Sequence, residues 1–380
     1  MLKIFQKKIS KEDYKDHLYA LLVVGGGGTR LWPVSKTSSP KQFLKLFDNK
    51  TLTQITSYRF NKILSWDHIF AVTTSDKYKK EIIKEVPEFV SENIIVEPMK
   101  RNTAAAHALG AVYILKKDPK AVILNEAADH LVDPQREYLK NLLSAAKAVY
   151  EKDLLLAIGI KPTYPNVGYG YIKMGDKLYE SDGKHVFKLD AFTEKPDLEV
   201  AKRYLAHGKY FWNANQYVWG AKSFLDALLK HAPEIAKGMN LIAQEIGTKN
   251  ESEIITKVYK SLPDVSVDYA VSEKAKNFIM IIADYGWTDI GDWKEVWENI
   301  PKDHGGNVII NGDEDGGEII NIDTTDALIH SDGRLIAAID VDNLIIVDTK
   351  EALLVCSKSH AQSVKKIVEL LKKQGRKELL

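Results

Sequence analysis

The feature that most constrains the fold is an apolar run, Leu18 to Val24, that leads directly into four glycines, Gly25 to Gly28. A short apolar run ended by glycines is typical of a strand buried on both faces of a parallel sheet. Glycines after such a strand let backbone N–H groups approach phosphate oxygens, and the nearby Arg30 adds charged donors. The segment therefore predicts a phosphate-binding loop, with a purely structural turn as the competing interpretation.

Two familiar glycine motifs do not fit this loop. In the dinucleotide pattern G-x-G-x-x-G started at Gly26, the last glycine position holds Leu31. In the Walker pattern started at Gly25, Arg30 stands where the second glycine belongs. An NAD-dependent oxidoreductase and a P-loop NTPase are therefore disfavoured.

Further strand-like runs alternate with helical patterns along the first part of the chain. Ile69 to Thr73, Ile94 to Val96 and Ala121 to Leu124 are predicted strands, and Leu52 to Leu64 and Thr103 to Lys117 are predicted helices. This alternation indicates a mostly parallel α/β sheet covered on both faces. Ligands bind to such sheets outside the carboxyl ends of the strands. From residue 154 the pattern is mixed, which we interpret as the same sheet continued with insertions.

The composition and the pattern of apolar residues change after Pro301. Residues 303–317 are rich in Gly, Asp and Asn, and the short apolar runs that follow are not separated by helical patterns. This predicts a small β domain, for which a left-handed β-helix is one geometry. A final amphipathic helix has Val364, Ile367 and Leu371 on one face. We therefore expect a catalytic domain over residues 1–300 and a β domain with a terminal helix over residues 301–380.

Composition excludes several other classes. Lys and Arg total 53 and Asp and Glu total 52, so the net charge of +1 disfavours a nucleic-acid partner. The charged segment Met1 to Asp16 lacks the apolar core of a signal peptide, and no early apolar run could span a bilayer. A single cysteine, Cys356, cannot form an internal disulfide and is expected as a buried thiol. We expect a cytoplasmic protein with no membrane partner.

The residues after the glycine run are more specific. Gly25 to Leu46 reads GGGGTRLWPVSKTSSPKQFLKL, which resembles the signature of the mannose-1-phosphate guanylyltransferases. Other segments resemble motifs of that family in the same order: Glu97-Pro98 with Arg101-Asn102-Thr103-Ala104, Ala128-Asp129-His130, Phe192-Thr193-Glu194-Lys195-Pro196, Tyr210-Phe211-Trp212-Asn213, Val267-Asp268-Tyr269-Ala270, and Trp287 to Trp293. The resemblance covers essentially Leu18 to Lys373.

This resemblance implies a Rossmann-like catalytic domain followed by a small β domain. It implies formation of GDP-mannose and pyrophosphate from GTP and mannose 1-phosphate, with Mg²⁺ as cofactor. The implied nucleotide-binding residues are Gly25, Gly26, Gly27, Gly28, Thr29, Arg30, Lys41, Glu97, Asn102 and Thr103. The implied sugar-phosphate residues are Gly170, Glu194, Lys195 and Asn213. The implied metal ligands are Asp129 and Asp289, and the catalytic set is Arg30, Lys41, Asp129, Lys195 and Asp289.

For the two aspartates, a purely structural role competes with metal binding. Asp129 could cap a helix or turn, and near Asp289 a second carboxylate, Asp292, could cap the helix that begins at Trp293. His130 is expected to position or pack rather than to act as a base, because the attacking phosphate oxygen is already anionic.

Several positions depart from the family pattern. Gly27 and Lys36 stand where serine and arginine are usual, and Asn125 to Ala128 replaces a leucine-proline approach to Asp129. Asn213 to Gln216 stands where the family has N-S-G-M or similar. Asn tolerates the left-handed conformation that glycine supplies, so we expect that turn to keep its shape while the choice of hexose stays open.

Four further expectations concern activity and assembly. The same reaction on another hexose 1-phosphate or nucleoside triphosphate is the main alternative. A non-catalytic sugar-nucleotide-binding regulatory homologue is disfavoured by the joint presence of the five catalytic candidates. An isomerase activity is expected to be absent, because the chain ends soon after its last helix. We also expect a homodimer built by the β domain and terminal helix, unless these strands cover the catalytic sheet of their own chain.

Overall fold

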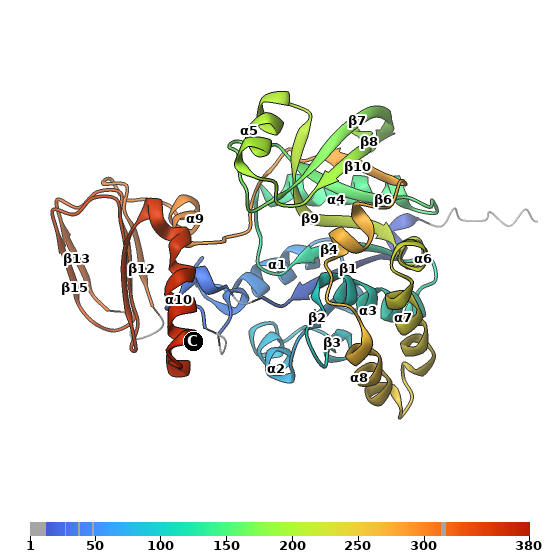
Figure 1. The fold of residues 1–380 in the computed structure, drawn as a ribbon, viewed down its shortest axis with the longest axis horizontal. Helices are drawn as coiled ribbons and strands as arrows, with labels where there is room; N and C mark the ends of the chain where they lie inside the picture. Colours follow the sequence, from blue (N-terminus) through green and yellow to red (C-terminus); the bar gives the residue numbers. More distant parts are fainter. Residues whose placement is uncertain (1–12, 27, 37–38, 48, 313–316) are drawn as a thin grey trace, which may run out of the picture.

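The structure is a computed structural model that describes residues 13–26, 28–36, 39–47, 49–312 and 317–380. Its larger part is organised around a nine-stranded sheet with the order β3-β2-β1-β4-β9-β6-β10-β8-β7, in which β7 also pairs with β9 (Figure 1). The strands are β1 (Leu18–Val24), β2 (Ile69–Thr73), β3 (Ile94–Val96), β4 (Val122–Ala127), β6 (Leu155–Ile160), β7 (Gly170–Ser181), β8 (Lys184–Thr193), β9 (Tyr210–Gly220) and β10 (Phe278–Ile282).

The sheet is parallel in one half and largely antiparallel in the other. β3, β2, β1 and β4 run parallel, whereas β9 enters antiparallel between β4 and β6. The predicted strands Leu18 to Val24, Ile69 to Thr73 and Ile94 to Val96 all form. Because β1 lies between two parallel neighbours, its glycine-rich exit opens at the carboxyl edge of the sheet, where ligands are expected.

Helices cover both faces of this sheet. One face packs against α3 (Asn102–Lys117), α6 (Ala221–His231), α7 (Pro233–Glu245) and α8 (Glu251–Ser261). The other face packs against α1 (Leu52–Asn61), α2 (Asp76–Glu85), α4 (Gln135–Val149) and α5 (Leu198–His207). Along β1, Tyr19 and Leu21 belong to the first core and Leu18, Ala20 and Leu22 to the second, as the two-residue period of a strand requires.

A small two-stranded antiparallel ladder stands apart from the main sheet. It pairs β5 (Leu131–Asp133) with β11 (Gly286–Thr288), and α9 (Trp293–Asn299) follows β11. The ladder joins two segments that are distant in the sequence. It matters for function because Asp129 lies just before β5 and Asp289 just after β11.

The C-terminal part is rich in strands. β12 (Val308–Asn311), β14 (Leu328–Ser331) and β16 (Leu344–Asp348) are parallel, β17 (Leu353–Ser357) closes that sheet antiparallel, and β13 (Ile319–Ile322) pairs in parallel with β15 (Ile336–Ile339). From β12 to β16, successive strands along the chain thus alternate between two sheets. α10 (Val364–Lys373) follows and lies between these strands and the rest of the chain (Figure 1).

One hydrophobic core joins the β domain to the glycine-loop region. Leu31 and Trp32 pack with Trp293 and with strand residues of the β domain such as Val308 and Ile345. Part of the helical face expected to form a dimer interface is used here instead: Val364 and Val368 are 2% and 5% exposed. Ile367 remains 42% exposed. Over the part of the chain that the structure describes, no helix is long and apolar enough to cross a membrane.

Candidate active site

The glycine loop follows β1 and turns sharply at Gly28. Gly28 has φ +52°, and a Cβ atom there would lie 2.6 Å from Ser35 Oγ and 2.7 Å from Lys41 Cβ. Only glycine combines this backbone conformation with this close approach. A short 3₁₀ helix over Thr29–Leu31 begins here and carries Arg30. Gly27, which was also expected to bind nucleotide, lies outside the described residues.

Lys41 is the centre of the candidate site. It begins a 3₁₀ helix over Lys41–Phe43 and is only 7% exposed. Its ammonium lies 2.8 Å from Asp129 Oδ2 and donates a hydrogen bond to the backbone carbonyl of Asp289. A buried ammonium requires such partners, because an unpaired charge away from water is costly. The structure thus brings together three of the residues singled out in the sequence.

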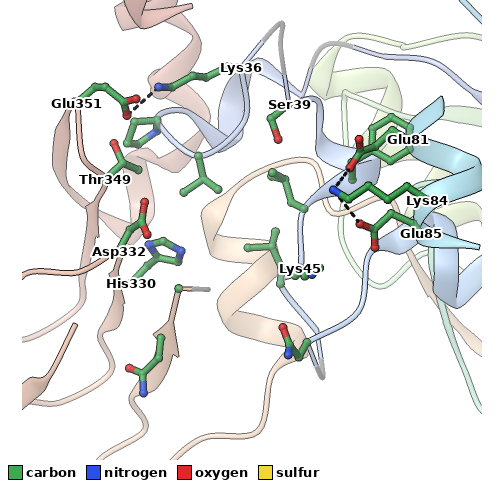
Figure 2. Close-up of a pocket in the computed structure, with 18 residues that line it drawn as sticks. Lys36, Ser39, Lys45, Glu81, Lys84, Glu85, His330, Asp332, Thr349 and Glu351 are labelled. Carbon is green, nitrogen blue, oxygen red and sulfur yellow. Dashed lines mark hydrogen bonds and ion pairs between the residues drawn. The ribbon is translucent and has the colours of Figure 1, made fainter. Parts of the chain in front are cut away.

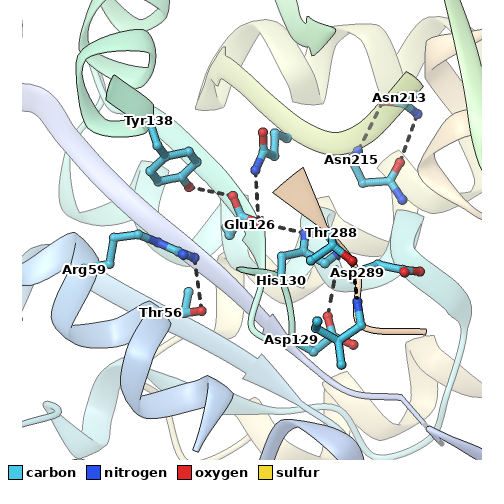
Figure 3. Close-up of polar contacts among 12 residues, drawn as sticks. Thr56, Arg59, Glu126, Asp129, His130, Tyr138, Asn213, Asn215, Thr288 and Asp289 are labelled. Atoms are coloured by element: carbon cyan, nitrogen blue, oxygen red, sulfur yellow. Dashed lines mark hydrogen bonds and ion pairs between the residues drawn. The ribbon is translucent and has the colours of Figure 1, made fainter. Parts of the chain in front are cut away.

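The β5–β11 ladder explains how two distant aspartates meet. Leu131 pairs with Thr288 at one end of the ladder. Asp129 precedes this pair on one strand and Asp289 follows it on the other, so both are delivered to the same place (Figure 3). Burial raises the pKa of the Asp129 carboxyl, but the charges of Lys41 and His130 outweigh it and hold that pKa below its usual value. Asp129 is therefore an anion at neutral pH.

Asp289 belongs to a turn against which the guanidinium of Arg30 lies. A Cβ atom built on Gly291 would lie 3.1 Å from Asp289 Oδ1 and 3.6 Å from Arg30 Nη1, which locates the guanidinium at this turn. Tyr169 donates to Asp289 Oδ1 at 3.1 Å and to Glu295 Oε1 at 3.3 Å. Burial and the nearby Asp289 raise the pKa of Glu295 to about 8.

The neighbouring carboxylate Asp292 has a different role. Its side chain accepts hydrogen bonds from the backbone N–H groups of Lys294 and Glu295, so it caps α9. It also accepts a hydrogen bond from Gln362 at 2.5 Å. Asp292 is therefore committed to structure, and Asp289 remains the candidate metal ligand of this turn.

The four predicted sugar-phosphate residues lie together near the start of β7. Gly170 pairs with Asn213 of β9, and a Cβ atom on Gly170 would lie 2.5 Å from Glu194 Oε2. Lys195 has φ +44° and donates to Glu194 Oε1. Burial raises the pKa of Glu194. A carboxylate and an ammonium are thus held next to a backbone position that has no side chain.

The segment from Asn213 to Gln216 does not form a separate turn but lies within β9, at an irregularity in the pairing of β9 with β6. Asn215 has φ +54°, so it adopts the left-handed conformation in place of glycine, as expected. The amide nitrogen of Asn213 donates to Asp268 Oδ1 at 2.9 Å, to Tyr217 Oη at 2.9 Å and to Asn215 Oδ1 at 3.0 Å. In this structure the amide nitrogen of Asn213 is thus engaged by the protein itself.

The remaining predicted nucleotide residues contact a different segment. Glu97 accepts a hydrogen bond from Tyr259 at 3.0 Å, and Thr103 Oγ1 accepts one from Val267 N at 2.9 Å. Asn102 Oδ1 accepts one from the N–H of Thr103 at 2.9 Å. These side-chain contacts fasten the start of α3 and the end of β3 to the chain around α8 and do not reach Lys41.

A polar cleft of about 420 Å³ lies beside the site, between the glycine-loop region, α2 and the β domain (Figure 2). An ion pair of 3.0 Å between Lys36 Nζ and Glu351 Oε2 spans it from the loop region to the β domain. His330 and Asp332 line the wall on the β-domain side. The cleft is not lined by Lys41 or the two aspartates, so we do not assign the reaction to it.

Sequence reasoning missed two residues near the site. Glu295 is the third residue after the capping Asp292. A glutamate at that position is usually interpreted as part of a helix cap. Glu126 is a fully buried carboxylate within β4. An ionisable residue inside an otherwise apolar strand is a signal that could have identified it.

Comparisons with known proteins identify the families to which the two parts of the chain are similar. The family model described as "Nucleotidyl transferase" matches residues 19–305, and one described as "MannoseP isomerase/GMP-like beta-helix domain" matches residues 317–371. The chain is thus a nucleotidyltransferase enzyme built on an α/β sheet.

Individual relatives identify the family within the nucleotidyltransferase class. A mannose-1-phosphate guanylyltransferase of Salmonella montevideo is 36% identical over 94% of this chain and 74% of its own length. One of Klebsiella pneumoniae is 36% identical over 95% of this chain and 75% of its own length. A crystal structure from Thermus thermophilus, described as a mannose-1-phosphate geranyltransferase, is 28% identical with a TM-score of 0.82, covering 94% of this chain and 99% of that one. The chain belongs to the mannose-1-phosphate guanylyltransferase family.

Proposed function

We propose that this enzyme joins GTP and mannose 1-phosphate to form GDP-mannose and pyrophosphate. The names of the relatives support this pair of substrates. The observation that carries the proposal is the position of the Lys41 ammonium between the Asp129 carboxylate and the Asp289 carbonyl. A site that binds a polyphosphate needs cations held in place and carboxylates that can share a metal with the phosphates, and these residues supply both.

The reaction needs little covalent assistance from the protein. A phosphate oxygen of the sugar phosphate attacks the α-phosphorus of GTP, a new P–O bond forms, and the bond to the β-phosphate oxygen breaks with its electron pair leaving on pyrophosphate. The attacking oxygen is already anionic, so no base is required. Catalysis then depends on alignment and on neutralising the charge that builds on the leaving group. We assign that task to the cations Arg30 and Lys41.

Asp129 and Asp289 fit a Mg²⁺ ion. Mg²⁺ is usually bound by one or two carboxylates, with phosphate oxygens and waters completing its coordination. Among the described residues no group of three or more His, Cys, Asp and Glu side chains forms a metal site. Asp129, whose carboxylate pairs with Lys41, and Asp289, whose backbone carbonyl accepts from the same ammonium, are the two carboxylate residues that would meet this smaller requirement. When bound there, the ion would neutralise phosphate oxygens of GTP.

The sugar phosphate would bind where β7, β8 and β9 meet. We infer that the Glu194 carboxylate accepts from sugar hydroxyls and that the Lys195 ammonium meets the phosphate. Gly170 leaves room beside Glu194 for the sugar to approach the backbone. We assign nucleotidyl transfer to residues 1–300 and keep residues 301–380 as a separate supporting domain.

A substrate matrix tests the function directly. The purified protein is incubated with Mg²⁺, each of the four nucleoside triphosphates, and mannose, glucose or another hexose 1-phosphate, and pyrophosphate release is measured. GTP with mannose 1-phosphate is expected to give the highest kcat/KM. A clear preference for UTP or dTTP with glucose 1-phosphate would overturn the substrate assignment and leave the reaction class standing.

A further inference from the structure

Glu126 is a carboxylate with no exposed surface, located near the end of β4. Three donors from different elements surround it (Figure 3). His130 Nδ1 lies 2.8 Å from Oε1, Tyr138 donates to Oε2 at 2.5 Å, and Gln216 Nε2 approaches Oε1 at 3.4 Å. A buried carboxylate is tolerated only with such partners. The side chain is therefore held in one orientation.

The partners of Glu126 are themselves held in place. Tyr138 is on α4, and Gln216 is on β9, the strand that also carries Asn213. The Gln216 amide oxygen accepts a hydrogen bond from Tyr285 at 2.6 Å, which turns the amide nitrogen toward Glu126. Positions 126 and 216 both depart from the family pattern in the sequence, and in the structure their side chains contact each other.

His130 connects this buried network to the candidate active site. Its Nδ1 is engaged by Glu126, and its ring meets the Trp287 ring edge to face at 5.1 Å. The other ring nitrogen, Nε2, then lies 3.8 Å from Asp129 Oδ1. The second oxygen of Asp129 is paired with Lys41. Asp129 is thus flanked by His130 on one side and by Lys41 on the other.

We propose that Glu126 is a positioning residue that acts through His130 to hold the Asp129 carboxylate in its functional orientation. The inference rests on the proposed function, because it takes Asp129 to be a ligand of the metal that accompanies GTP. Glu126 itself is fully buried, and its side-chain contacts among the described residues are with His130, Tyr138 and Gln216. Residues that orient the ligands of a metal in this way typically change metal affinity or activity about 10- to 100-fold when replaced.

The test measures how much Mg²⁺ strengthens GTP binding, without turnover. GTP is titrated into the full-length protein by calorimetry with and without Mg²⁺, and the ratio of the two Kd values is the metal-dependent gain. Glu126→Gln keeps the size of the side chain and removes its charge. We expect the gain to fall about tenfold, kcat to fall about tenfold, and the metal-free Kd to stay within about twofold.

Two variants separate positioning from general loss of structure. Tyr138→Phe removes the hydrogen bond to the other oxygen of Glu126 and leaves the His130 contact in place, so the metal-dependent gain should fall less than in Glu126→Gln. His130→Asn should reproduce the loss seen in Glu126→Gln, and the double variant should lose no more than either alone. Melting curves verify that each variant is folded.

The outcomes distinguish the inference from the function on which it rests. A Glu126→Gln variant with the full metal-dependent gain would overturn the positioning role. Losses that multiply in the double variant would also overturn it, since Glu126 would then act independently of His130. If the unsubstituted protein shows neither Mg²⁺-dependent GTP binding nor turnover, the proposed function itself fails, and that result is seen before any variant is compared.

Discussion

The ammonium of Lys41 lies 2.8 Å from the carboxylate of Asp129, and this pair links the glycine-loop region of the chain to the ladder that carries both aspartates. The contact shows that the loop after β1 and the segment before β5 form one site. It also shows why a single lysine can stay almost completely buried, since its charge is balanced where it sits.

Replacing either aspartate is expected to abolish turnover. Asp129→Asn and Asp289→Asn each remove a negative ligand with little change in volume, and the loss of kcat should be about 10²-fold or more. Steady-state rates at saturating Mg²⁺ check this, with melting curves to verify the fold. Asp133→Asn, at the far end of the same ladder, is the matched control and should keep near-normal rates. Near-normal turnover in Asp289→Asn would move the role to another carboxylate.

Adding a methyl group at Gly170 should weaken sugar-phosphate binding selectively. The new Cβ atom would lie 2.5 Å from Glu194 Oε2, so the carboxylate must move. For Gly170→Ala we expect KM for mannose 1-phosphate to rise about tenfold or more, with KM for GTP nearly unchanged. Gly220→Ala is the control, because its Cβ atom would lie no closer than 3.3 Å to Ser223 Oγ and it stands before α6. Equal effects on both KM values would contradict the assignment.

The stability of the protein should depend on pH through Glu97. Burial raises the pKa of Glu97 from 4.5 to about 7, despite the opposing hydrogen bond from Tyr259 and charge of Lys100. The folded protein therefore holds a proton that the unfolded chain has released between these values, and Glu97 costs stability as pH rises from about 5 to 8. Relative to the unsubstituted protein, Glu97→Gln should gain on the order of 2 kcal/mol over that range.

Denaturant unfolding of the two proteins at pH 5 and pH 8 measures this difference. Gln retains an oxygen that can accept from Tyr259, so the comparison isolates the charge. A difference in unfolding free energy that is the same at both pH values would show that Glu97 is ionised in the folded state throughout.

Removing the β domain should weaken nucleotide binding. Trp32 donates to the Leu379 carbonyl at 2.8 Å and accepts on its own carbonyl from Trp293 at 3.0 Å, so the C-terminal residues hold the glycine-loop region directly. We expect a chain truncated before Gly305 to melt at lower temperature and to bind GTP at least tenfold more weakly. Trp32→Phe, which loses only the N–H donor, should have a smaller effect. A soluble fragment with unchanged GTP affinity would refute this dependence.

We also predict a homodimer, with the interface on the strands of the β domain rather than on the buried side of α10. Ile320, Ile322 and Ile339 on β13 and β15 are 44%, 51% and 64% exposed, a small apolar face that a second copy could cover. Light scattering at micromolar concentration should give twice the chain mass, and Ile322→Lys with Ile339→Lys should give the single chain. A monomeric unsubstituted protein would end the dimer hypothesis.

Local pattern was sufficient to predict the strands at Leu18 to Val24, Ile69 to Thr73 and Ile94 to Val96, but not β9, which enters the middle of the sheet antiparallel. The run from Leu18 to Val24 forms β1 with the expected limits. The pairing of β5 with β11 could not be predicted from the sequence, because each strand has three residues and nothing in their spacing indicates a partner. The contacts of Glu97 with Tyr259 and of Glu126 with His130 depend on tertiary packing in the same way.

The glycine-loop region and the β domain share a hydrophobic core. Nucleotide binding and the docking of the β domain are therefore coupled. Leu31 and Trp32 contribute to that core, and Arg30, next to them in the chain, is one of the residues proposed to bind the phosphates of GTP. By thermodynamic linkage, whatever free energy the docked β domain adds to GTP binding, GTP must add to docking. On heating, the unliganded enzyme should therefore lose affinity for GTP at a lower temperature than that at which the central sheet unfolds. Saturation with GTP should raise both temperatures.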